Sequence, residues 1–71
     1  MNGLPQLFKV ELLPSAMDCD VTKRIAQEHG LKENTPYLAL GFLGMQDYIV
    51  LVSDKGAVVE LPYDEENFCF Y

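Results

Sequence analysis

Tryptophan is absent from this chain of 71 residues, and cationic residues are scarce. Five lysines and arginines stand against eleven aspartates and glutamates, which gives a formal net charge of −6. Proteins bind nucleic acids mainly through cationic side chains that contact the phosphates. The excess of acidic residues therefore argues against direct nucleic-acid binding. No apolar run approaches the roughly 18 residues that span a bilayer, and the first residues lack a basic stretch followed by an apolar one. We therefore expect a cytoplasmic protein without a membrane partner.

The residue types that commonly carry catalysis or bind metals are also few. Cys19 and Cys69 are the only cysteines and His29 is the only histidine, and they lack the close paired spacing of zinc sites. His29 falls where a helix is expected to end, and the helix dipole favours a cation there, so a capping role is the simpler interpretation. We expect the cysteines to be free thiols, with one disulfide between them as the alternative. The sequence thus predicts no catalytic residue, no metal, no cofactor and no enzyme activity.

Apolar residues, by contrast, are plentiful: 49% of the chain is hydrophobic, which is typical of an ordered protein. A chain of this length predicts a single domain, residues 1–71. Its apolar centre is the stretch 37–52, where two runs flank the breaker cluster 44–47 and so predict a β-hairpin. Both runs are apolar at odd and even positions alike. We therefore expect this hairpin to be covered on both faces, by the core on one and by a helix, a second copy or a partner on the other.

The flanking segments predict further strands and one helix. Residues 7–13 alternate as a half-buried strand does, and residues 57–61 and 68–71 predict two more strands after the hairpin. Residues 16–29 predict an amphipathic helix whose apolar stripe consists of Met17, Val21 and Ile25 at four-residue spacing. The expected core combines that stripe with inward-facing strand residues, namely Phe8, Val10, Leu12, Leu38, Leu40, Phe42, Ile49, Leu51, Val59, Leu61, Phe68 and Phe70.

This order of segments resembles the SH3-like small β-barrel. In that fold a long loop separates the first two strands, a tight hairpin joins the third and fourth, and a single helical turn precedes the fifth. The local match is Pro62 before a short turn and an aromatic strand. The chain lacks both tryptophan and an acidic–aromatic run ahead of Pro36, the features that line a proline-peptide groove, so the resemblance does not extend to that ligand. Together with the helix predicted at residues 16–29, such a barrel gives an α+β fold. The alternative architecture is an open antiparallel sheet of four to five strands with one amphipathic helix inserted after the first strand.

Because the sequence argues against catalysis, metal binding and direct nucleic-acid binding, the expected function is binding of a protein. One candidate surface is the second face of the central hairpin, and the other is the acidic aromatic C-terminal end. The candidate partner-binding residues on these two surfaces are Tyr37, Leu43, Tyr48 and Val50, and Tyr63, Asp64, Glu65, Glu66 and Tyr71. We predict a small acidic protein-interaction module, an inhibitor or an accessory subunit, whose partner is a basic protein or a second copy in a homodimer. The alternative is a nucleic-acid mimic that occupies the basic groove of a nuclease or regulator, a role found among small acidic phage and mobile-element proteins.

Overall fold

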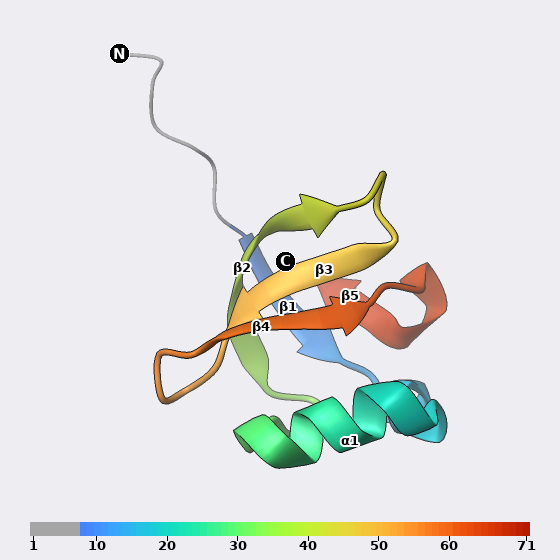
Figure 1. Cartoon of the computed structure of the whole chain (residues 1–71), viewed down its shortest axis with the longest axis vertical. Helices are drawn as coiled ribbons and strands as arrows, with labels where there is room; N and C mark the ends of the chain where they lie inside the picture. The colour runs from blue at the N-terminus through green and yellow to red at the C-terminus, as the bar shows by residue number, and fades with distance from the viewer. Residues whose placement is uncertain (1–7) are drawn as a thin grey trace.

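The structure, a computed structural model, describes residues 8–71, and five antiparallel strands form its single sheet (Figure 1). The strands are β1 (Phe8–Leu12), β2 (Pro36–Leu43), β3 (Tyr48–Val52), β4 (Val58–Pro62) and β5 (Phe68–Phe70). The 3-10 helix η1 (Pro14–Asp18) and the α-helix α1 (Asp20–His29) lie between β1 and β2, and the 3-10 helix η2 (Glu65–Asn67) precedes β5. The predicted α+β fold with one helix after the first strand is confirmed. Leu7, the predicted start of the first strand, lies outside the described residues.

The sheet is open. Its strand order is β4-β3-β2-β1-β5, and within the described residues the edge strands β4 and β5 do not pair with each other. The connections are those that the SH3-like resemblance implies, with a long excursion after β1, a tight loop between β3 and β4, and a helical turn before β5. Of the two predicted architectures, the open antiparallel sheet with an inserted helix is therefore the one observed.

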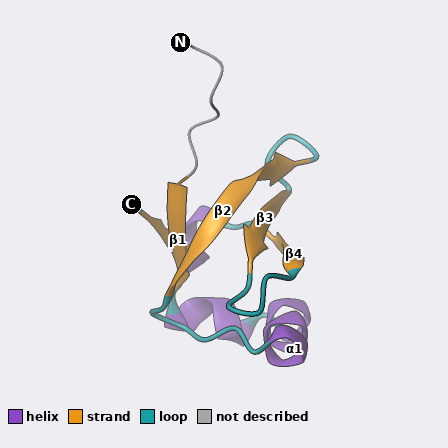
Figure 2. Cartoon of the chain, turned by 90° about the vertical axis from the view of Figure 1, so that its left-hand side faces the viewer, coloured by secondary structure: helices purple, strands orange, loops and turns teal. Residues whose placement is uncertain are grey.

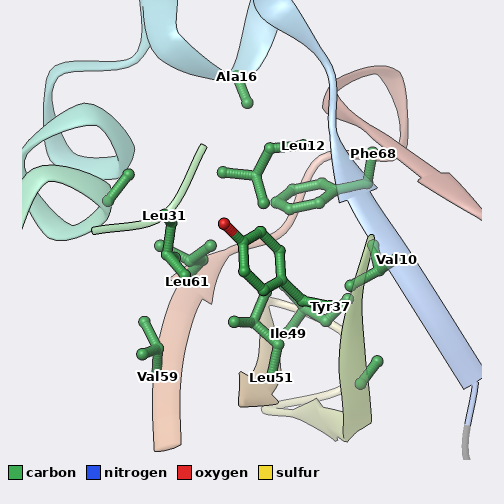
Figure 3. Close-up of a cluster of buried hydrophobic side chains, with 12 residues drawn as sticks. Val10, Leu12, Ala16, Leu31, Tyr37, Ile49, Leu51, Val59, Leu61 and Phe68 are labelled. Carbon is green, nitrogen blue, oxygen red and sulfur yellow. The ribbon is translucent and has the colours of Figure 1, made fainter. Parts of the chain in front are cut away.

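The core lies on the inner face of this sheet, where strand side chains meet η1, α1 and the segment after α1 (Figure 3). Tyr37 lies in the middle of the labelled side chains, and its phenolic oxygen accepts a hydrogen bond from the Lys32 backbone N–H at 2.8 Å. The buried hydrophobic residues are Val10, Leu12, Ala16, Ala26, Leu31, Tyr37, Ala39, Ile49, Leu51, Val59, Leu61 and Phe68.

The first half of β2 faces the other way from the prediction. Tyr37 and Ala39 are buried, whereas Leu38 and Leu40 are 38% and 44% exposed. The prediction that Leu38 and Leu40 point inward was therefore wrong, and so was the placement of Tyr37 and Ala39 on the second face of the hairpin.

A β-bulge in β2 explains this reversal. Ala39 is paired with the β3 residue Leu51, but Gly41 is paired with the very next β3 residue, Val50, so Leu40 is an extra residue in β2. Because side chains alternate with a period of two, one extra residue moves every preceding side chain to the opposite face. Gly41 has a φ of 152°, a backbone conformation that glycine adopts far more readily than other residues. Beyond the bulge the alternation is as predicted.

The buried stripe of α1 also differs from the prediction. Thr22 and Ala26 are buried, while Val21 is 51% exposed. The predicted helix was continuous from residue 16, but the backbone at Cys19 is extended (φ −88°, ψ 118°) and separates η1 from α1. Met17 therefore lies outside the regular helix, and its spacing to Val21 does not define a common face.

Candidate interaction surfaces

One face of the β2–β3–β4 meander is apolar and exposed. It is the face opposite to the core, and its side chains come from three adjacent strands. Five of its residues are between 38% and 61% exposed, although they are large hydrophobics. We call this the outer face, and it consists of Leu38, Leu40, Leu43, Tyr48, Val50, Val52 and Val58.

The strand register brings these side chains into contiguous rows. Leu38 of β2 pairs with Val52 of β3, which pairs in turn with Val58 of β4, so the three form one cross-strand row. At the hairpin end of the sheet, Leu43 pairs with Tyr48. Side chains directly opposite each other in antiparallel strands lie close enough to touch. The outer face is therefore one continuous apolar surface.

The helix does not cover this surface. In both views α1 lies across one end of the strands, below the sheet (Figures 1 and 2). Its buried residue Ala26 belongs to the core cluster of the inner face. We expected a cover over both faces of the hairpin, by a helix, a second copy or a partner. The residues described here cover only the inner face.

Two opposite charges border the outer face. Lys9 on β1 pairs with Leu38 at one side of the patch, and Glu60 on β4 pairs with Val50 at the other side. Both charged residues are exposed. The neighbouring carboxylate on β1, that of Glu11, accepts a hydrogen bond from the Tyr71 hydroxyl. The β1 flank of the apolar surface thus carries Lys9 and Glu11, and the β4 flank carries Glu60.

A second feature is an aromatic cluster on the inner side that joins β1 and β5 to β2 and the end of β4. The tightest pair is Phe42 and Tyr63, whose rings meet edge to face with centroids 4.9 Å apart. Phe70 is 38% exposed and lies 5.4 Å from Phe8 and 5.9 Å from Tyr63, centroid to centroid. Phe70 was predicted to be a core residue, so its exposure is a correction. The rings pack on one another, and within residues 8–71 no pocket opens between them.

Acidic residues lie next to Tyr63 along the chain and in its backbone hydrogen bond. Its backbone N–H donates to the carbonyl oxygen of Asp47 at 2.8 Å. Asp64 follows it directly and accepts the backbone N–H of Glu66 through its side chain at 3.1 Å, which caps η2. Asp64, Glu65 and Glu66 are all exposed. Asp64 thus has a structural role as the cap of η2.

The structure separates the predicted binding residues into four groups. Leu43, Tyr48 and Val50 lie on the outer face, as predicted. Tyr63 lies with the three acidic residues after it, whereas Tyr71 hydrogen-bonds to Glu11 on the other side of the sheet. Tyr37 is 3% exposed and belongs to the core. The sequence missed Leu38 and Leu40 as outer-face residues, and the available signal was Gly41, since an isolated glycine inside a strand pattern often marks a bulge.

The thiols are the remaining reactive groups. Cys19 and Cys69 are both free. Cys19 precedes the first residue of α1, and the backbone N–H of Thr22 lowers the pKa of its thiol, with the Thr22 side chain and the Val21 backbone N–H acting in the same direction. In residues 8–71, histidine, cysteine, aspartate and glutamate side chains form no group of three that could hold a metal ion. No helix in this part of the chain is long and apolar enough to cross a bilayer.

Comparison with known proteins adds no assignment to this geometry, since no family model, no curated protein and no solved structure matches the chain.

Proposed function

We propose that this chain is a small acidic protein-interaction module that binds a protein partner through its outer face. The observation that carries the proposal is the row of Leu38, Val52 and Val58, apolar side chains that lie on the face opposite to the core. Burial of apolar surface stabilises a complex by roughly 25 cal/mol for each Å² removed from water. Contiguous apolar patches on a soluble chain commonly mark such contacts.

The shape of the surface favours a macromolecular partner. Small-molecule sites are concave and enclose most of the ligand, whereas residues 8–71 form no pocket. A sheet face of three strands can instead pack against another sheet or helix, as the faces of β-sandwiches do. Proteins of this kind act as accessory subunits or inhibitors by occupying a surface, and no chemistry of their own is required.

The test compares two valine-to-lysine variants. Val58→Lys places a charge on the outer face, and Val21→Lys places the same charge on α1, where the valine is similarly exposed (61% and 51%). Tagged wild type and both variants are used to capture partners from the native host, after circular dichroism has shown that each folds. We expect Val58→Lys to lose the partner at any salt concentration and Val21→Lys to retain it.

Two outcomes would contradict the proposal. If Val58→Lys binds every recovered partner as the wild type does, the outer face is not the contact. If instead binding falls steeply with added salt and depends on Glu65 and Glu66, the acidic end carries it. That result would favour the alternative of a nucleic-acid mimic, whose affinity rests on charge.

A further inference from the structure

We infer that the partner of the outer face is a second copy of this chain, related by a two-fold axis that runs along the strands between β2 and β3. This inference rests on the proposed function, since it names the occupant of the same surface. Lys9 and Glu60, the charges on the two flanks of the outer face, carry it.

The flanking charges select one orientation of the second copy. Lys9 lies on β1 and Glu60 on β4, so the two are on opposite sides of the line between β2 and β3. A two-fold axis along that line places the β1 side of one copy over the β4 side of the other. Lys9 of each copy then meets Glu60 of its partner, and the contact occurs twice because the interface is isologous.

A two-fold axis in the same plane but across the strands cannot form these pairs. It places the β1 side of one copy over the β1 side of the other, and the β4 side over the β4 side, so Lys9 of one copy lies three strand spacings from Glu60 of its partner. The Lys9–Glu60 pairs therefore require the axis along the strands.

The apolar rows match in the favoured arrangement. With the axis between β2 and β3, the β2 residue Leu38 of one copy lies over the β3 side of the other, where Val52 and Val50 project. Val58 of β4 lies over the aliphatic stem of Lys9, a part of the lysine that packs well on apolar surface. Lys9 and Glu60 belong to adjacent cross-strand rows, roughly 7 Å apart along the strands, an offset that the long lysine side chain can bridge.

The size of the surface predicts a weak dimer. Over the five residues that β3 and β4 each span, the three strands cover roughly 14 Å by 17 Å at ordinary strand spacing and rise. Such a footprint falls into the small class of interfaces, which bury less than about 1,200 Å² and belong to weak complexes. The dimer should therefore exchange with monomer and dominate only at high protein concentration.

Charge exchange tests this geometry directly. Lys9→Glu and Glu60→Lys each turn both attractive pairs of the dimer into repulsive ones, and the double variant restores both with the two charges exchanged. Sedimentation velocity over a range of concentrations measures the dimer dissociation constant of each protein. We expect each single variant to weaken the dimer about tenfold and the double variant to return it to the wild-type value.

Two control variants and a mixing experiment distinguish the effect of the local Lys9–Glu60 pairs from the effect of net charge. Lys23→Glu and Glu28→Lys make the same charge changes at exposed positions of α1 and should leave dimerisation near the wild-type value. An equimolar mixture of Lys9→Glu and Glu60→Lys should form a heterodimer, because each attractive pair then reappears between the two chains.

The inference is overturned if the wild type is a monomer at every concentration. It is also overturned if the double variant folds and fails to regain the affinity that the single variants lose. Neither result touches the proposed function, which depends on whether Val58→Lys loses a partner captured from the host. A monomeric protein whose capture is abolished by Val58→Lys would leave a different protein as the occupant of the outer face.

Discussion

Tyr37 and Lys32 are joined by a hydrogen bond in which the tyrosine oxygen accepts the lysine backbone N–H at 2.8 Å. The bond ties β2 to the segment that follows α1, and its acceptor belongs to Tyr37, a core residue that is 3% exposed. This contact explains how a tyrosine that the sequence assigns to a binding surface is instead held inside. A buried tyrosine ordinarily finds a partner for its hydroxyl.

The first prediction is that Tyr37→Phe destabilises the fold by about 1 kcal/mol, because the substitution leaves the Lys32 N–H without its acceptor. Tyr48→Phe removes the same hydroxyl from a tyrosine that is 47% exposed, and it should change the free energy of unfolding by less than about 0.5 kcal/mol. Urea unfolding monitored by circular dichroism measures both. Equal effects of the two substitutions would show that the bond contributes nothing.

The second prediction tests the bulge in β2. Leu40 is the extra residue of that bulge and is 44% exposed, so Leu40→Ala should cost less than about 1 kcal/mol. The register without a bulge would bury Leu40 and raise that cost to ~2–5 kcal/mol. Ala39 is fully buried opposite Leu51, so Ala39→Leu should overpack the core and cost ~1–3 kcal/mol. If chemical denaturation shows that Leu40→Ala destabilises the protein more than Ala39→Leu does, side chains of β2 alternate without a bulge and the prediction is contradicted.

Local signals in the sequence placed the end of α1 and the loop between β3 and β4 correctly, because these signals act within a few residues. Gly30 ends α1 in the left-handed conformation (φ 68°), and its N–H donates to the last carbonyls of the helix. Gly56 has a φ of 82° in the tight loop between β3 and β4, as predicted for that position. Such glycines are required by the local backbone alone, so they can be recognised without knowledge of the fold.

The orientation of β2 could not be predicted in the same way. Leu38 and Leu40 are more apolar than Ala39, so hydrophobicity alone favours placing them inside. The bulge overrides this preference, and it depends on pairing with β3, a contact that the sequence does not display. The site was consequently predicted in part. Tyr48 and Val50 follow from the regular strand β3 and Leu43 from β2 beyond the bulge, whereas before the bulge Tyr37 was predicted in place of Leu38 and Leu40.

The third prediction concerns the loop between β2 and β3. Gly44, Met45 and Gln46 all have positive φ values, of 61°, 59° and 74°. A non-glycine residue in the left-handed region costs roughly 1–2 kcal/mol, so Gln46→Gly should stabilise the protein by up to about 1 kcal/mol once the higher flexibility of glycine in the unfolded chain is deducted.

Lys55→Gly provides the matched control for this substitution. Lys55 also lies in an exposed hairpin loop, but its φ is not positive, so glycine relieves no strain there. It should destabilise by about 0.5–1 kcal/mol through unfolded-state entropy alone. Thermal unfolding of both variants measures the difference. A lower melting temperature for Gln46→Gly than for wild type would contradict the strained turn.

The fourth prediction concerns the Cys19 thiol, whose pKa is lowered chiefly by the backbone N–H of Thr22 and further by the Thr22 side chain. Hydrogen bonds that stabilise the thiolate make it the more populated form at a given pH, and the thiolate is the reactive species. In a Cys69→Ser background, alkylation of Cys19 by iodoacetamide is followed by mass spectrometry across a pH series. The midpoint should lie lower in the native protein than in the same protein unfolded in guanidinium chloride. Thr22→Ser keeps a hydroxyl and should preserve most of the pKa shift. Identical midpoints for the native and the unfolded protein would contradict the lowered pKa.

The same shift sets the sign of a pH-dependent contribution to stability. Because the folded state has the lower thiol pKa, the unfolded state binds more protons between the two pKa values, and the free energy of unfolding rises with pH across that window. The contribution is complete above the unfolded pKa and is lost as the pH falls through the folded one. Urea unfolding of the Cys69→Ser protein at several pH values up to about 8.5 should therefore show a positive slope, and Cys19→Ser in that background should remove it. A slope that survives Cys19→Ser unchanged would assign the pH dependence to another group.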